Sequence, residues 1–200
     1  MYSMEWAVPL QKIDVNKINV GQIRYGEKPL APLAYSDGLI HLPSVNILLP
    51  PLLVKDYDPQ TGRLKLSIQD NTTVLHTLSA LQETLLKIVF QKQSEWFPGS
   101  RKTSEELHVF FQPFVENNII NLYCPSAVTG NISIPIWKDR VWSKGVTSGS
   151  IVKGDTIRVG LRIQGISFQH NLESDIWTGR FRLQHKILQV FCCPKAMMSV

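Results

Sequence analysis

The spacing of apolar residues constrains the fold of this 200-residue chain most, because it follows two different periods. In one stretch, apolar residues recur every three or four positions, at Val74, Leu78, Leu81, Leu85 and Ile88. This spacing draws an apolar stripe along one side of an α-helix, which we predict over residues 72–93. Most other apolar residues alternate with polar ones or form short β-branched runs, as in β-strands.

Short extended segments separated by turn formers precede this helix. We predict strands in residues 22–70, namely at 22–25, 39–41, 45–49, 52–57 and 64–68. The Asp-Pro-Gln-Thr-Gly sequence at 58–62 separates the last two and is typical of a hairpin turn. Residues 1–21 are expected to form an N-terminal arm.

The strand period returns after the helix, and we predict strands over residues 105–191, followed by a tail at 192–200. Leu107, Val109 and Phe111 alternate with other residues, and two long alternating segments cover 156–168 and 179–191. A single helix among many strands, without a βαβ rhythm, favours a mainly β fold with one long helix. We expect one domain over residues 1–200, a partly open, antiparallel, OB-like β-barrel.

Composition places the chain among soluble globular proteins. No apolar run is long enough to span a membrane, and no secretory signal pattern begins the chain, so we expect no membrane association. The three cysteines are an odd number and two of them are adjacent, which disfavours a disulfide framework and fits a reducing, intracellular compartment. Neither a metal site nor a cofactor is predicted.

Positive charge is confined to one half of the sequence. Residues 1–100 hold nine Lys or Arg and nine Asp or Glu, a net charge of zero, whereas residues 101–200 hold twelve against seven, a net charge of +5. A basic region on an otherwise neutral domain attracts phosphate groups. A merely soluble basic surface is the alternative reading of this charge.

The strand IRVGLRIQGISF at 157–168 is the most informative segment. Because side chains alternate across a strand, Ile157, Val159, Leu161 and Ile163 should face the core, whereas Arg158, Arg162 and Gln164 should share the other face. Gly160 lies between the two arginines and is expected to leave a flat area that a base could approach. The alternative is an ordinary solvated strand face.

The strand RFRLQHKILQVF at 180–191 repeats this arrangement. Its face Arg180, Arg182, Gln184 and Lys186 is polar, and its apolar side chains Phe181, Leu183, Ile187 and Phe191 are expected on the opposite face. If the two strands are neighbours, five basic side chains converge on one surface.

Indole rings and cations are interleaved in IWKDRVWSKG at 136–145. The candidate residues are Trp137, Lys138, Arg140, Trp142 and Lys144. Proteins that bind single strands use cations for phosphates and aromatic planes for unstacked bases. We expect at least one of the two indoles on the binding surface, and we expect the Gly- and Ser-rich loop at 145–154, with Lys153, to close over a ligand.

A third basic and aromatic group follows the helix, at Trp96, Arg101 and Lys102. It is an additional binding candidate, although an apolar plug at the end of the helix explains Trp96 equally well. Enzyme signatures such as a P-loop or a Gly-x-Ser-x-Gly elbow do not occur, so we predict no enzymatic activity.

The order of these elements resembles the single-stranded DNA-binding proteins of large nucleocytoplasmic DNA viruses. The resemblance covers residues 40–191 and is one of pattern, including the helix and the segment ELHVFFQPFV. Only GISF at 165–168 and KILQVF at 186–191 are alike residue by residue. The resemblance implies an OB-like core and a protein that coats single strands during viral DNA replication, recombination or repair, in the host cytoplasm or nucleus.

These observations predict sequence-independent binding of single-stranded DNA, with homo-oligomers and replication proteins as further partners. Binding of double-stranded DNA or RNA is an open alternative. The main rival is a viral jelly-roll capsid or assembly protein without nucleic-acid binding, in which apolar segments such as 48–53 and 191–200 would form protomer contacts.

Overall fold

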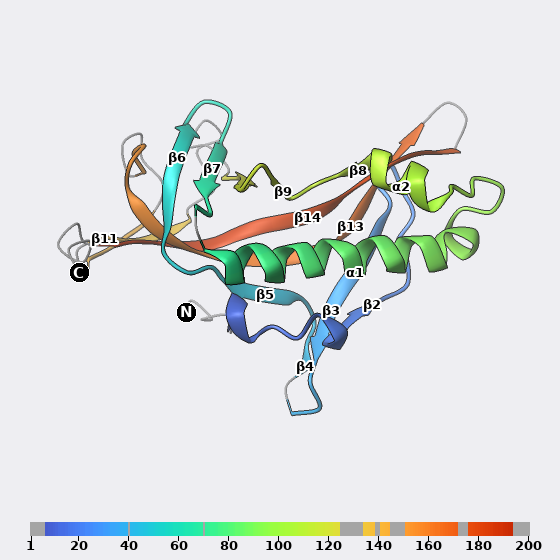
Figure 1. Cartoon of the computed structure of the whole chain (residues 1–200), viewed down its shortest axis with the longest axis horizontal. Coiled ribbons are helices and arrows are strands. Elements are labelled where there is room, and N and C mark those ends of the chain that lie inside the picture. The colour runs from blue at the N-terminus through green and yellow to red at the C-terminus, as the bar shows by residue number, and fades with distance from the viewer. Residues whose placement is uncertain are drawn as a thin grey trace.

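A computed structural model describes residues 7–39, 41–69, 71–124, 134–138, 141–144, 151–171 and 176–193, with only the backbone of 141–144 (Figure 1). Two long antiparallel strands, β13 (Thr156–Asn171) and β14 (Ile176–Cys192), run through the middle of the molecule. Both predicted late strands are confirmed, and each is longer than expected. We call the pair the central ribbon.

β13 also pairs along its other edge with three strands in turn. Residues 156–157 pair with β6 (Leu52–Asp58), residues 160–163 with β5 (Val45–Leu48) and residues 165–167 with β3 (Leu30–Ser36). The change of partner from β5 to β3 coincides with Gly165, where a Cβ atom would collide with the carbonyl oxygen of Ala31. Glycine is therefore required where the backbone of β3 comes this close.

The sheet continues from β6 through a predicted hairpin. β7 (Arg63–Ser67) pairs with β6, and the Asp58 carboxylate accepts hydrogen bonds from the backbone amides of Gln60 and Thr61 in the turn. β10 (Ile119–Tyr123) and β9 (Val115–Glu116) follow in order.

The segment predicted as an N-terminal arm contains structure of its own. It holds β1 (Val8–Pro9), the 3₁₀ turns Leu10–Lys12 and Val15–Lys17, and β2 (Ile18–Val20). β2 and β4 (His41–Leu42) pair with β3.

Parallel pairs distinguish this sheet from the antiparallel one that we predicted. β11 (Pro135–Lys138) and β8 (Phe111–Gln112) both run parallel to β14, and β1 runs parallel to β5. β12 (Val141–Lys144) is antiparallel to β11. The result is a mainly β protein with a large mixed sheet that does not close.

One long helix, α1 (Thr72–Trp96), lies along the central ribbon (Figure 1). The Asn71 side chain caps it by accepting a hydrogen bond from the Val74 amide. The predicted stripe is buried at Val74, Leu78, Leu81 and Leu85, and the helix ends three residues later than predicted. We call the ribbon face packed in this core the inner face, and the opposite one the outer face. None of the helices in the described ranges is both long and apolar enough to cross a membrane.

Two predictions of local structure were wrong. Residues 104–110 form a second helix, α2 (Ser104–Phe110), because Thr103 and Glu106 make a reciprocal capping box that outweighs the alternation of Leu107 and Val109. Residues 22–25 form only an isolated bridge, Arg24 to Leu30, whereas β3 beside them was not predicted.

Candidate nucleic-acid interface

The cations of the central ribbon share its outer face. In the antiparallel register, Arg162 lies opposite Lys186, and Ser167 lies opposite Arg182. Opposed residues project from the same face. Residues two positions apart also share a face, so Arg158 and Arg180 join them. The predicted neighbouring of the two strands is confirmed, and it brings five basic residues onto one surface.

These cations differ in how far they project. Arg180, Arg182 and Lys186 are exposed, whereas Arg158 and Arg162 are half-buried. The Arg158 Nε donates a hydrogen bond of 3.4 Å to the Leu49 carbonyl oxygen. Among the described residues, a salt bridge joins Lys92 to Glu95 on α1, and none involves Arg180, Arg182 or Lys186. The charges of these three exposed side chains are thus not neutralised by carboxylates of the described residues.

Amide side chains lie between the cations. The Gln184 Nε2 donates to the Gln164 Oε1 at 3.4 Å across the ribbon. The flat area that we predicted at Gly160 is occupied instead, because a Cβ atom there would lie 3.0 Å from the Gln189 Cγ. The middle of the face is therefore polar and covered by side chains.

An aromatic pair marks the Arg158 end of the outer face. The rings of Trp137 and Phe191 stack with centroids 6.3 Å apart and planes 14° apart, and Trp137 is 39% exposed. We predicted Phe191 on the inner face. The ribbon register shifts between Ile187 and Gln189, so one extra residue reverses the alternation and places Phe191 opposite Arg158.

Several other candidates of this segment lie at or beyond the limits of the described residues. Lys138 is exposed at the end of β11. The Cα atom of Trp142 pairs with that of Trp137, and Lys144 with Pro135, but only the backbone of these β12 residues is described. Arg140 and the loop at 145–150 lie outside the described residues. Lys153 is exposed in the turn before β13.

Trp96 does not belong to this surface. It is 3% exposed and packs edge-on against Phe168 with ring centroids 5.6 Å apart, so the plug alternative describes it correctly. Arg101 is exposed, and the Lys102 ammonium lies 5.9 Å from the centroid of the Phe110 ring.

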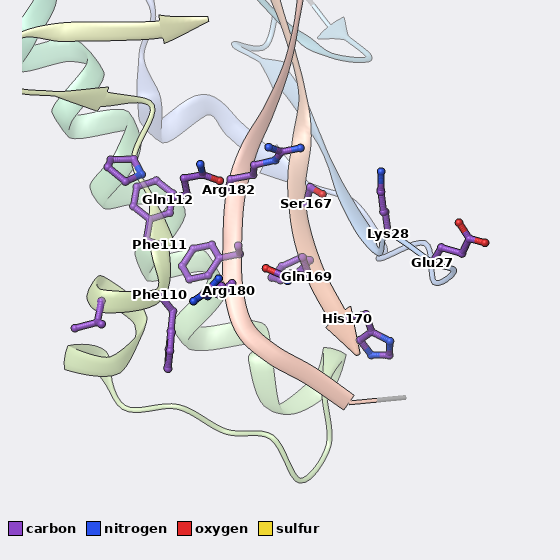
Figure 2. A pocket seen from close by; sticks show the side chains of 14 residues that line it. Glu27, Lys28, Phe110, Phe111, Gln112, Ser167, Gln169, His170, Arg180 and Arg182 are labelled. Atoms are coloured by element: carbon purple, nitrogen blue, oxygen red, sulfur yellow. The ribbon is translucent and has the colours of Figure 1, made fainter. Parts of the chain in front are cut away.

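A cavity that the sequence did not reveal adjoins the Arg182 end of the outer face. We call it the end cavity; its volume is about 780 Å³. Figure 2 shows Arg182 reaching across the ribbon towards Ser167, with Phe111 and Gln112 beyond one strand and Lys28 beyond the other. Its lining is Glu27, Lys28, Val109, Phe110, Phe111, Gln112, Pro113, Ser167, Phe168, Gln169, His170, Arg180, Phe181 and Arg182.

Two glutamines of α1 hold the cavity wall at 109–113 in place. The Gln82 Oε1 accepts hydrogen bonds from the amides of Phe114 and Val115, at 2.8 and 3.0 Å. The fully buried Gln93 exchanges two hydrogen bonds with the Lys102 backbone, at 2.7 and 2.9 Å. The wall is therefore anchored to the helix on both sides of α2.

A neutral histidine lies on the inner face of the central ribbon, where His185 is opposite Ile163. Burial lowers the pKa of His185 to about 4, and its Nε2 lies 3.2 Å from the Tyr123 amide, which donates to it. This hydrogen bond needs an unprotonated Nε2. Burial also raises the pKa of the Cys124 thiol to about 11. Within the described ranges, no three His, Cys, Asp or Glu side chains gather as a metal site would require.

In comparisons with known proteins, no family model, no curated protein and no solved structure matches the chain.

Proposed function

We propose that the protein binds single-stranded DNA without sequence preference and acts in DNA replication, recombination or repair, in a virus. The observation that carries this proposal is the row of five cations along the outer face of the central ribbon. An OB-like, partly open barrel as the fold class of this sheet belongs to the same proposal. Cations hold phosphates but read no bases, which fits binding that ignores sequence.

The dimensions of this row suit a flexible strand. Ser167, which lies opposite Arg182, is nine positions after Arg158, so at roughly 3.3 Å per residue the row from Arg158 to Arg182 covers about 30 Å. This length accommodates roughly five nucleotides, near the lower end of the 4–16 that OB folds bind. The Trp137 and Phe191 rings at one end supply an aromatic surface for a base.

The test is a titration of the protein with oligo-dT, followed by tryptophan emission at several salt concentrations. Five phosphate contacts to a single strand predict a slope of about −3.5 in a plot of log affinity against log salt. Trp137 emission should be quenched as bases stack on it. An affinity that barely changes with salt, or unchanged emission, would contradict the proposal.

The double variant Arg158→Ala with Arg162→Ala tests the row itself. Its salt slope should become shallower by about 1.4, because two of the five contacts are lost. A matched control, Lys12→Ala with Lys17→Ala, removes two cations from the N-terminal 3₁₀ turns and should leave the slope unchanged. Competition with duplex DNA and oligo-U ranks the ligands, and a sizing column checks for a symmetric oligomer that ignores DNA.

A further inference from the structure

The end cavity carries a net positive charge and adjoins the proposed DNA path. Lys28, Arg180 and Arg182 line it against one carboxylate, that of Glu27. Arg182 and Ser167 belong both to the outer face and to the cavity. An anionic ligand on the outer face therefore meets the cavity at the Arg182 end.

The remaining lining suits a flat, heteroaromatic group. The rings of Phe110 and Phe111 are half-buried, and Phe111 rests on Phe181 with ring centroids 5.2 Å apart. The side chains of Gln112 and Gln169 offer amide donors and acceptors beside these rings. Cavities of about 300–1,000 Å³ with an apolar wall and a few polar groups are typical of small-ligand sites.

Anion, flat ring and hydrogen-bonding edge are together the chemistry of a nucleotide. We propose that the end cavity takes one nucleotide of the bound strand, with its base turned against Phe111 and its phosphate held by Arg180, Arg182 and Lys28. This inference rests on the proposed function and adds to it that one end of the bound strand is held at the end cavity. The strand lies flat over the ribbon and turns a base into the protein at one end.

The decisive measurement compares two ligands of the same length, oligo-dT and a wholly abasic strand. The dissociation constant of the abasic strand divided by that of oligo-dT reports the contribution of the bases alone. The variant Phe111→Leu keeps an apolar side chain against Phe181 but removes the aromatic plane. We expect this ratio to fall about tenfold relative to the wild-type protein, the order of one lost stacking contact.

Two controls accompany this variant. Phe90→Leu removes a 41% exposed ring from α1 and should leave the ratio unchanged. Arg182→Ala should weaken both ligands alike, because it removes a phosphate contact. A Phe111→Leu protein that folds and keeps the wild-type ratio would overturn the inference.

Photo-crosslinking tests the same inference on the wild-type protein, without any substitution. Oligo-dT that carries 4-thiothymidine is irradiated on the protein, and the adducts are mapped by mass spectrometry. We expect an adduct within residues 109–113; adducts confined to the Trp137 end would overturn the inference. If the wild-type protein binds oligo-dT with the expected salt slope, such a result contradicts only the cavity. If it does not bind, the proposed function fails and the cavity inference with it.

Discussion

The two faces of the central ribbon are made from the same two strands but serve opposite purposes. On the inner face Ile157, Val159, Leu161 and Ile163 are fully buried. On the outer face Arg180, Arg182 and Lys186 are exposed. The difference shows how alternation along a strand separates stability from binding, so that moving a substitution by one residue should change which property is lost.

The largest effect should come from the inner face. Phe168 is 2% exposed and its ring contacts those of Trp96, Phe97, Trp177 and Phe181. The variant Phe168→Ala should lose about 3–5 kcal/mol of unfolding free energy, because it leaves a cavity among these rings. Urea denaturation followed by tryptophan fluorescence measures this loss.

The matched control moves one residue along β13. Gln169 is exposed, and Gln169→Ala should change the unfolding free energy by less than about 0.5 kcal/mol. Equal losses for the two variants would erase the distinction between the faces.

An intermediate effect should come from acid, through the half-buried His185. Its pKa is lowered to about 4 by burial, with a further contribution from Arg182, whereas an unfolded chain titrates near 6.5. The unfolded state therefore binds more protons below pH 6.5, and stability is lost as the pH falls from 6.5 towards 4. We expect a loss of about 2–3 kcal/mol between pH 7.5 and 4.5 from this group.

The variant His185→Gln isolates that contribution. A glutamine oxygen can accept the Tyr123 amide hydrogen bond but does not titrate. Unfolding free energies of the variant, measured by denaturation at the same two pH values, should fall by about 2–3 kcal/mol less than those of the wild-type protein. Parallel losses would show that His185 titrates normally in the fold.

The smallest effect on stability should come from the outer face. Lys186→Ala removes an exposed cation and should change the unfolding free energy by less than about 0.5 kcal/mol. The same variant should make the salt slope for oligo-dT shallower by about 0.7. Denaturation and titration of one preparation give both numbers, and a large stability loss with an unchanged slope would reverse our assignment of this face.

Sequence periodicity predicted the elements whose burial is one-sided and uninterrupted. α1 carries its stripe from Val74 to Leu85 without a break, and β13 alternates cleanly from Ile157 to Ile163. In both, local spacing and tertiary burial agree. The cations of each strand were therefore predicted on one face, and the pairing of β13 with β14 brings the two sets together.

Elsewhere a second signal competed with alternation. Leu107 and Val109 have strand spacing, yet Thr103 and Glu106 are a capping box that could have revealed α2. Pro29 and Pro32 are atypical of strands, so β3 was not predicted; it is stabilised by pairing with β13 rather than by its own propensity. Phe191 was predicted on the wrong face because no local sequence pattern indicates the bulge between Ile187 and Gln189.

The end cavity could not be predicted for a different reason. Its walls come from residues far apart in the chain, Lys28 before β3 and Phe110 to Pro113 after α2. They meet only because β3 pairs with β13, and β8 with β14, at the same end of the ribbon. Such a site depends on topology, and neither wall has a motif of its own.

Gly165 links the interior of this sheet to the shape of the cavity without lining it. Since the Ala31 carbonyl rests where a side chain would begin, any larger residue must push β3, and with it the turn that carries Lys28, away from the ribbon. A substitution at Gly165 should thus change the width of the end cavity. Variants designed to alter ligand preference should therefore include Gly165 as well as the residues that a ligand would touch.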